Sequence, residues 1–152
     1  MATRTFELTT TVPVTPPAAI DFLVDLSRHH GLHPYVVSAG VVDSGRDPDG
    51  SWQDWRVVER PRLGPIRYMI RFPARMTRTS ANSMRGDVTA ARGCTLVTTT
   101  TATAADESAV LHETTVVTAP WLLVGYMARQ ARIAHARTFS SLPRELAASS
   151  AS

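Results

Sequence analysis

Residues 110–142 read VLHETTVVTAPWLLVGYMARQARIAHARTFSSL, and the spacing of their apolar residues changes at Pro120. Before Pro120 apolar residues recur about every second position, which is typical of a β-strand with one buried face. After Pro120 they recur about every 3.6 positions, the period of an amphipathic α-helix. We therefore expect a C-terminal helix of roughly twenty residues, ended or kinked at Pro143. Its buried stripe would contain Val124, Met127, Ala128, Ala131, Ala134, His135, Thr138 and Leu142.

The chain before this helix predicts one strand after another from residue 35 onward. Clusters rich in Gly, Pro and Asp, such as residues 44–50 and 61–65, mark the turns between them. Such short connections favour an antiparallel meander. The expected strands cover residues 35–43, 52–60, 66–76, 84–90, 94–103 and 110–119.

The N-terminal segment predicts a strand and then a short helix. Threonine and apolar residues alternate over residues 5–14, the pattern of a half-buried strand. Thr15 is the expected N-cap of the helix, with Pro16 and Pro17 in its first turn, where a missing amide donor costs nothing. One amphipathic helix must bury its stripe on the sheet, so the predicted fold class is α+β.

Residues 66–76 have the clearest alternation in the chain. We expect an inner face of Ile66, Tyr68, Ile70, Phe72, Ala74 and Met76. Arg67, Arg71, Arg75 and Thr77 would point outward, and Pro73 indicates an edge position or a bulge. The arginine row is interpreted as a solvated face paired with carboxylates. An acidic partner or a membrane surface is the alternative.

Composition favours one ordinary globular domain. The chain has 152 residues, of which 43% are hydrophobic and 19% charged, enough for a core without metal or disulfide support. Cys94 is the only cysteine, which excludes an intramolecular disulfide and a cysteine metal cluster. The longest apolar run, residues 121–128, is far shorter than the ~20 residues of a membrane span, and the first residues lack the apolar block of a signal peptide. We expect a cytoplasmic protein with no integral membrane association.

The charge pattern argues against a nucleic-acid partner. All 16 basic residues are arginine, and the net charge is only +3. Nucleic-acid-binding proteins usually gather their cations on one element, whereas these arginines are scattered along the chain. We therefore expect no nucleic-acid partner.

The order of elements, together with three short stretches, resembles the START-like superfamily, also called SRPBCC or helix-grip. The stretches are Leu32-His33-Pro34, residues 60–65 (RPRLGP) and residues 120–126 (PWLLVGY), and they are similar to small bacterial polyketide cyclase/dehydrase members. The resemblance implies a curved antiparallel sheet of about six to seven strands wrapped around the long C-terminal helix, with short helices after the first strand. It implies a single START-like domain over residues 1–146, followed by a tail (147–152) that we expect to be disordered. It fixes no reaction, because one fold hosts carriers, receptors and enzymes.

An apolar cavity between sheet and helix would be lined by aromatic, aliphatic and small side chains. Aromatic side chains there would hold a planar or acyl ligand, and small residues on the helix would leave room for it. The alternative is that these residues simply form the core. The candidate ligand-binding residues are Trp55 (or Trp52), Tyr68, Ile70, Phe72, Met76, Tyr126, Ala128, Ala131 and His135.

His33, His135 and Tyr68 are the candidate catalytic residues. Histidine titrates near neutral pH and can act as a general acid or base; the alternative is an ordinary structural role. His29, His30 and His33 lack further ligands to complete a zinc site, so we expect no metal. The scattered glycines form no phosphate-binding loop, so we expect no nucleotide cofactor.

Three functions remain open. The leading hypothesis is a binding protein for a small hydrophobic molecule, such as a polyketide-like aromatic, an acyl chain or an isoprenoid. The second is a polyketide cyclase/dehydrase-type enzyme that uses the same cavity, and the third is an interaction or regulatory protein with a filled core. A cavity of some 300 Å³ or more would separate the first two from the third. We expect a monomer or a homodimer.

Overall fold

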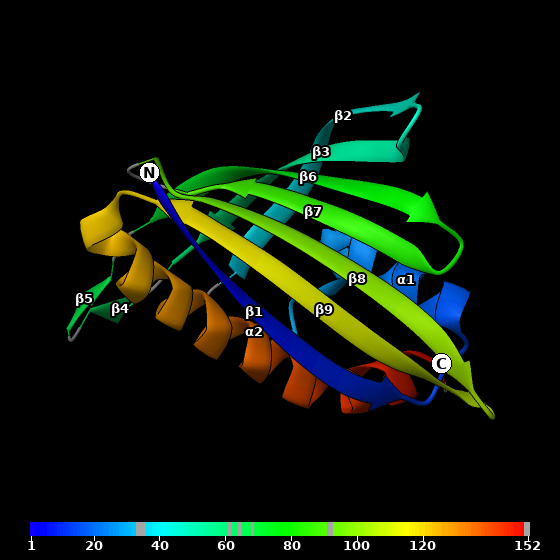
Figure 1. Ribbon diagram of the computed structural model, residues 1–152. Helices are drawn as coiled ribbons and strands as arrows, with labels where there is room; N and C mark the ends of the chain where they lie inside the picture. The colour runs from blue at the N-terminus through cyan, green and yellow to red at the C-terminus, as the bar shows by residue number, and fades with distance from the viewer. Residues whose placement is uncertain (33–35, 61, 64, 68, 91–92, 151–152) are drawn as a thin grey trace.

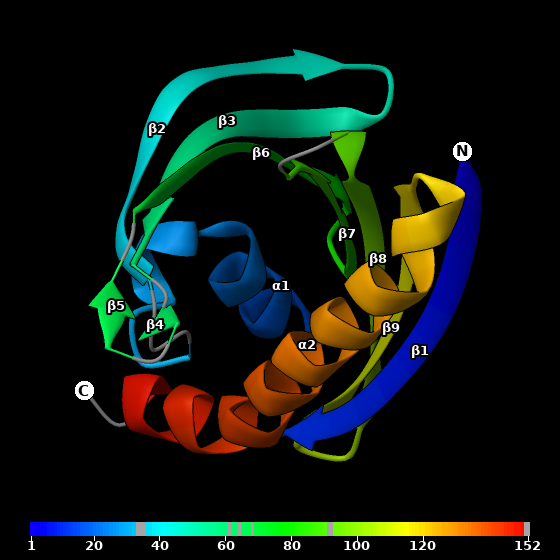
Figure 2. The same ribbon diagram turned by 90° about the vertical axis from the view of Figure 1, so that its left-hand side faces the viewer.

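The computed structural model describes residues 1–32, 36–60, 62–63, 65–67, 69–90 and 93–150. Seven strands form one antiparallel sheet in the order β1-β9-β8-β7-β6-β3-β2, which curls around the helices (Figures 1 and 2). The strands are β1 (Ala2–Val12), β2 (Val36–Asp47), β3 (Gly50–Glu59), β6 (Ile70–Ser80), β7 (Ser83–Thr89), β8 (Thr95–Ala105) and β9 (Ser108–Ala119). A separate small hairpin consists of β4 (Arg62–Leu63) and β5 (Ile66–Arg67). The predicted curved antiparallel sheet is confirmed.

Three helical segments lie on the concave side of the sheet: α1 (Pro16–Val24), the 3₁₀ turn η1 (Leu26–Arg28) and α2 (Trp121–Ser150). Thr15 caps α1 as predicted, because its hydroxyl accepts a hydrogen bond from the Ala18 amide at 3.4 Å. The first half of α2 packs on β1 and β9, where Val124 meets Phe6 and Val117 in one core cluster. A second cluster joins α1 to the last turns of α2. The helices are therefore held at two ends, and the middle of the concave face lies between these clusters.

Helix α2 is longer than the sequence predicts, because it continues through Pro143 to Ser150. A proline inside a helix removes one backbone hydrogen bond and costs about 3 kcal/mol. Leu142 and Leu146 on either side of it are fully or almost fully buried, and each contributes about 1.5–3 kcal/mol of apolar burial. The Ser149 hydroxyl also accepts a hydrogen bond from Arg28 of η1 at 2.7 Å. Packing thus offsets the cost of the proline, and residues 147–150 are helical where the sequence suggests a disordered tail.

The strand predicted over residues 66–76 is two strands. Ile66 pairs with Leu63 in the β4–β5 hairpin, and β6 begins at Ile70. Within β6 the predicted faces hold: Ala74 is buried and Met76 half-buried, whereas Arg71 and Arg75 are exposed. Thr77 is an exception, because it is 6% exposed although it belongs to the outward row.

Pro73 belongs to an interior strand, because β6 lies between β7 and β3, but it stands where the pairing with β7 ends. It is in register with Arg56 of β3, but the pairing of β6 with β7 begins one residue later, at Ala74. The missing amide hydrogen of Pro73 therefore leaves no gap in the β6–β7 ladder.

One arginine of the outer row, Arg75, is paired with a carboxylate, whereas Arg71 contacts the Met69 sulfur at 3.7 Å. Arg75 donates two hydrogen bonds to Asp54, at 2.6 and 2.9 Å, and its guanidinium lies 4.0 Å from the centre of the Trp52 ring. The hydrogen bonds from Arg75 hold the pKa of the Asp54 carboxyl below its ordinary value. This pairing supports the interpretation of a solvated face at Arg75.

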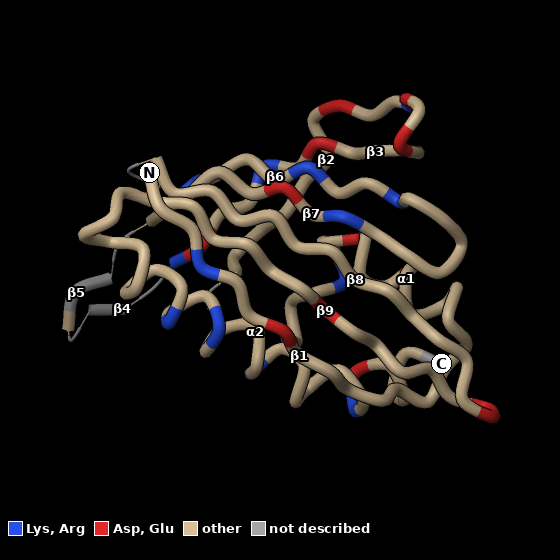
Figure 3. Tube along the Cα trace, viewed as in Figure 1, with Lys and Arg blue, Asp and Glu red and all other residues tan. Residues whose placement is uncertain are grey.

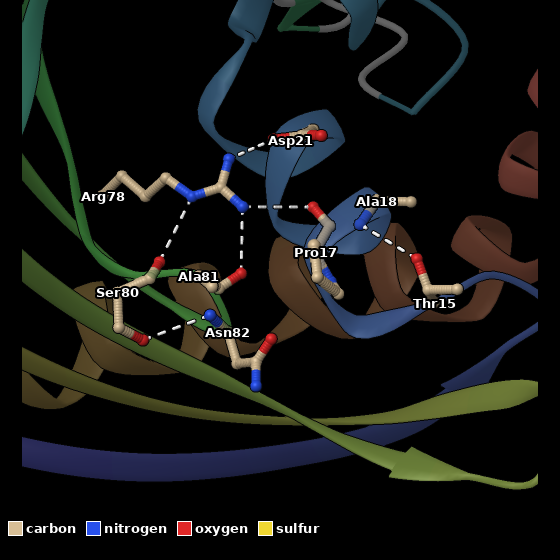
Figure 4. A network of polar contacts seen from close by, with 8 residues as sticks. All are labelled: Thr15, Pro17, Ala18, Asp21, Arg78, Ser80, Ala81 and Asn82. Carbon is tan, nitrogen blue, oxygen red and sulfur yellow. Dashed lines mark hydrogen bonds and ion pairs between the residues drawn. The ribbon is translucent and has the colours of Figure 1, made fainter.

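Arg78 fastens α1 to the turn between β6 and β7 (Figure 4). Its guanidinium forms an ion pair with Asp21 and donates to the backbone carbonyls of Pro17 at 3.3 Å and Ala81 at 2.9 Å. A third carbonyl, that of Ser80, accepts from Nε at 3.2 Å. One side chain thus positions α1 over the end of the concave face.

Strand β2 is an edge strand of the sheet, beside β3. Its pairing with β3 is irregular. The register between β2 and β3 shifts twice, between Val36 and Ser38 and between Val41 and Asp43. The strand carries charged side chains at Asp43, Arg46 and Asp47. These shifts bend the strand locally and increase its twist.

Candidate functional site

A cavity of about 310 Å³ lies between the concave face of the sheet, the α1–η1 segment and the middle of α2. Its volume is at the lower end of the range of small-molecule pockets, about 300–1,000 Å³. Most of its wall is apolar. The apolar lining residues are Leu23, Leu26, Val36, Ala39, Val57, Phe72, Ala74, Met76, Met84, Val88, Leu96, Ala131, Ala134 and Phe139.

A hydrogen-bonded cluster interrupts this wall where α2 faces β9. His135 Nδ1 lies 2.5 Å from Glu113 Oε1, and the same carboxylate oxygen accepts a hydrogen bond from the Thr115 hydroxyl at 3.0 Å. Thr98 of β8 extends the cluster through a 3.0 Å contact between the two threonine hydroxyls. Glu113 is only 6% exposed and Thr115 is fully buried, so these hydrogen bonds compensate for the loss of water around a buried carboxylate.

Local sequence explains why these groups meet. Inward and outward side chains alternate along β9, and Glu113 shares the buried face with Leu111 and Thr115. On α2, His135 belongs to the predicted stripe, and the edge of its ring contacts Phe6 of β1, with 5.6 Å between the ring centres. Two elements that are regular on their own thus bring one imidazole and one carboxylate together.

The Nε2 atom of His135 is available to hydrogen-bond a bound molecule. Because Glu113 Oε1 accepts from Thr115, we assign Nδ1 of His135 as a second donor to this oxygen. Nε2 makes no hydrogen bond with any residue in the described ranges. Since His135 lines the cavity, Nε2 is the nitrogen through which it can accept or donate a proton to a bound molecule.

Two further titratable side chains line the cavity. His29 Nε2 donates to the Phe22 carbonyl at 2.8 Å, and its ring stacks on Phe22. Burial lowers the pKa of His29, more strongly than the Phe22 carbonyl and nearby Asp25 raise it, so this imidazole is neutral at pH 7. Burial also raises the pKa of Glu59 at the end of β3.

The structure places some of the predicted ligand-binding residues on the cavity wall and others elsewhere. Phe72, Met76, Ala131 and His135 line it. Ile70 and Ala128 are not among its lining residues, and Ala128 packs beside Val124 instead.

The predicted aromatic residues mostly lie away from the cavity. Trp55 is buried against Val57 and Ala74 and lines a second hollow between η1 and the β2–β3 pair. Tyr126 is 63% exposed. His33 and Tyr68 lie outside the described residues, so their predicted catalytic roles stay predictions.

Sequence reasoning missed Glu113, Glu59 and His29 as lining residues. A signal for Glu113 exists in the sequence, because strict alternation along residues 109–119 puts this one carboxylate on the apolar face. The equivalent signal for Glu59 is weaker, since it is the last residue of its strand. For His29 the sequence gives no such signal, because the segment after α1 has no regular alternation of apolar and polar residues.

The described residues contain no group of three or more His, Cys, Asp or Glu side chains that could hold a metal ion. Cys94 is buried, and burial raises the pKa of its thiol, which makes it a poor nucleophile. None of the helices, over the residues described, is both long and apolar enough to cross a bilayer.

Comparison with known proteins identifies the fold. No protein-family model and no curated protein sequence matches the chain. Among solved structures, the protein TTHA0849 from Thermus thermophilus superposes with a TM-score of 0.73 at 16% identity, over 97% of this chain and 99% of the other. The Zhui aromatase/cyclase from Streptomyces sp. R1128 gives 0.76 at 13% identity, over 95% and 94%. A START superfamily protein from Mycobacterium smegmatis gives 0.67 at 12% identity, over 93% and 98%. The seven-stranded curved sheet around one long helix is therefore the START-like, helix-grip fold, which this chain shares with the Zhui aromatase/cyclase and the START superfamily protein.

Proposed function

We propose that this protein binds a small hydrophobic molecule in the cavity between the sheet and α2. The observation that carries the proposal is an apolar cavity of about 310 Å³ with its hydrogen-bonding cluster on one wall. Apolar burial supplies affinity at about 25 cal/mol per Å², and one polar group fixes orientation. A ligand of this kind has an apolar body and one hydroxyl or carbonyl, as in a polyketide-like aromatic or a short acyl or isoprenoid chain.

Ligand binding can be tested without knowing the ligand. Native mass spectrometry of protein purified from its producing cells should show a bound apolar molecule, and an apolar fluorescent dye should bind saturably with one site per chain. The dye should be displaced by a bicyclic phenol but not by its fully hydrophilic sulfonated analogue. Absence of both a bound molecule and saturable dye binding would refute the proposal and favour a filled-core interaction protein.

A second function, polyketide cyclase/dehydrase-type catalysis, is favoured by the His135–Glu113 pair. In this mechanism Nε2 of His135 takes a proton from the carbon beside a substrate carbonyl, and the resulting carbanion attacks a second carbonyl to close a ring. Glu113 stabilises the imidazolium formed at His135, as a carboxylate does for a histidine base. The imidazolium then returns its proton to the alkoxide formed by this attack, which becomes a hydroxyl group. In a second proton transfer Nε2 takes a hydrogen from the adjacent carbon and delivers it to that hydroxyl group, which leaves as water as the carbon–carbon double bond forms. The cavity contributes by holding the two carbonyls in reacting geometry.

The two functions differ in what His135 is needed for. With a short poly-β-ketone thioester as substrate, an enzyme should release cyclised, dehydrated product at a rate that His135→Phe lowers by a factor of about 10² or more. The same variant should keep binding of the apolar dye within a few-fold. If wild-type protein binds the thioester but releases no product, the carrier function stands and the enzymatic one fails.

We further propose a cytoplasmic location and no nucleic-acid partner. The scattered arginines and net charge of +3 support this proposal, because a nucleic-acid interface needs cations gathered along one groove or stripe facing phosphates.

A further inference from the structure

The outward side of α2, at the end away from the C-terminus, carries large apolar side chains in water. Trp121 and Leu122 are each 74% exposed and Tyr126 is 63% exposed. Ile133, at 47%, continues this row two turns later. At about 3.6 residues per turn Leu122, Tyr126 and Ile133 project from the side of the helix opposite Val124, which is buried against the sheet. Trp121 projects beside this row, about 60° around the helix from Val124. None of them lines the cavity, so the proposed ligand site does not explain them.

Arginines continue along the same side of the helix. Arg129, Arg132, Arg137 and Arg144 are all exposed, and none has an ion pair with a described residue. At about 3.6 residues per turn, they and the apolar tip fall within an arc of about 160°. We call this combined surface the outer face of α2.

The outer face of α2 has charge of one sign. The helix contains a single acidic residue, Glu145, which is half-buried and lies against Gly31. Figure 3 shows the basic residues along α2 and their place on the outside of the molecule. A basic helix face with Trp, Leu and Tyr at one end has the composition of helices that lie in the interface of an anionic membrane.

We propose that the outer face of α2 docks on an anionic lipid bilayer. Trp and Tyr favour the zone between lipid headgroups and acyl chains, so the tip at Trp121, Leu122 and Tyr126 enters that zone. The arginine row then lies along the headgroups, where each arginine contributes attraction to anionic lipid. From Trp121 to Arg144 the row extends for about 35 Å, at about 1.5 Å per residue.

A bilayer fits this surface better than another protein does. Helix α2 runs along the outside of the molecule (Figure 1), and its exposed apolar side chains can enter a deformable headgroup layer. A protein partner would need a matching hollow and an acidic stripe of equal length. A flat anionic membrane offers negative charge along the full row without such matching.

The test is cosedimentation with phosphatidylcholine vesicles, with and without about one third of phosphatidylglycerol. We expect binding to the anionic vesicles only, with a blue shift of tryptophan emission. Because Arg129 and Arg132 each contribute about fivefold, Arg129→Gln/Arg132→Gln should weaken binding about 25-fold. Trp121→Ala/Leu122→Ala should weaken it by more than about tenfold. All four side chains are exposed, so these variants should fold normally.

Matched control variants distinguish specific docking of the outer face of α2 from nonspecific binding driven by overall charge or by exposed apolar side chains. Arg46→Gln/Arg56→Gln removes the same charge from exposed positions on β2 and β3, and Val42→Ser removes a 60% exposed apolar side chain from β2. Both should bind like wild type within about twofold. Equal loss in the controls, or no binding of wild type to anionic vesicles, overturns the proposal. So does a concentration-dependent dimer that the Trp121→Ala/Leu122→Ala variant abolishes, since a second copy would then be the occupant.

Discussion

His135 on α2 and Glu113 on β9 are joined across the cavity wall by a contact of 2.5 Å between Nδ1 and Oε1. A second histidine–carboxylate pair, His112 with Glu7, lies at 3.4 Å on the outside of the sheet, where both side chains are about half exposed or more. The two pairs share the same chemistry and differ in burial. They therefore provide an internal comparison of what burial does to such a pair.

The first prediction uses this comparison. His135→Phe leaves the 6% exposed carboxylate of Glu113 without its imidazole partner, and should lower the free energy of unfolding at pH 7 by about 2–4 kcal/mol. Glu113→Leu/His135→Phe should recover at least half of that loss, because no buried charge remains. His112→Phe, the exposed control, should change stability by less than about 1 kcal/mol. Urea unfolding measures all three, and a single variant as stable as wild type would contradict the pairing.

The second prediction concerns space in the cavity. Ala131 lines it, so Ala131→Leu should place its added atoms in the void and weaken ligand or dye binding by tenfold or more. It should cost less than about 1.5 kcal/mol of stability, because no packed neighbour must move. Ala136→Leu adds the same atoms at an exposed position of the same helix and should leave binding unchanged. Calorimetric titration measures binding, and thermal unfolding measures stability. A large loss of stability without loss of binding would mean that the Ala131 side chain faces closely packed core residues rather than the cavity.

The third prediction follows from the raised pKa of Glu59. In the window between the ordinary value of 4.5 and the raised value, the folded protein holds a proton that the unfolded chain has released. Stability therefore falls as pH rises through this window and is level above it. Glu59→Gln should remove the fall and unfold later than wild type at pH 7, whereas Glu107→Gln, in an exposed turn, should not. Identical pH profiles for wild type and Glu59→Gln would count against burial of this carboxyl.

The fourth prediction has the opposite sign. Burial lowers the pKa of His29 below its ordinary value of 6.5. On acidification below 6.5 the unfolded chain takes up a proton that the folded protein resists, so stability present above 6.5 is lost as pH falls toward the lowered value. His29→Gln should flatten the dependence on the acid side of pH 6.5, and His30→Gln, which is exposed, should leave it intact. Chemical unfolding at a series of pH values provides the test.

The fifth prediction concerns the proline inside α2. Pro143→Ala restores a backbone donor and relieves the clash with the preceding turn, so it should raise the free energy of unfolding by about 1–3 kcal/mol. Pro16→Ala, at the start of α1 where no donor is needed, should change it by less than about 0.5 kcal/mol. A destabilised Pro143→Ala variant would show that the proline shapes the packing of Leu142 and Leu146.

Local periodicity accounts for how much of this molecule can be predicted from sequence. The alternation in residues 110–119 and the 3.6-residue spacing after Pro120 predict β9 and α2, and with them the place of Ala131 and His135. The same period puts Tyr126 on the opposite side from Val124, which agrees with its exposure. Tyr126 is accordingly not among the residues that line the cavity.

The partners across the cavity were not predictable in the same way. Alternation puts Glu113 on an inner face, but its approach to His135 depends on how far α2 slides along β9, and no spacing within either element encodes that offset. Likewise Pro143 locally predicts the end of α2, but the helix continues because the burial of Leu142 and Leu146 offsets the cost of the proline.

The irregular edge strand β2 has a consequence for the chain at high concentration. A regular edge presents an unbroken row of amide hydrogens and carbonyls to which a second copy can add its own strand, and Thr- and Val-rich strands favour such growth into fibrils. The shifts at Val36/Ser38 and Val41/Asp43 break that row into short pieces, and Asp43, Arg46 and Asp47 place charges beside it. Edge-to-edge pairing is thereby disfavoured at β2, so the same two register shifts that bend the strand also work against self-templated aggregation of the folded protein.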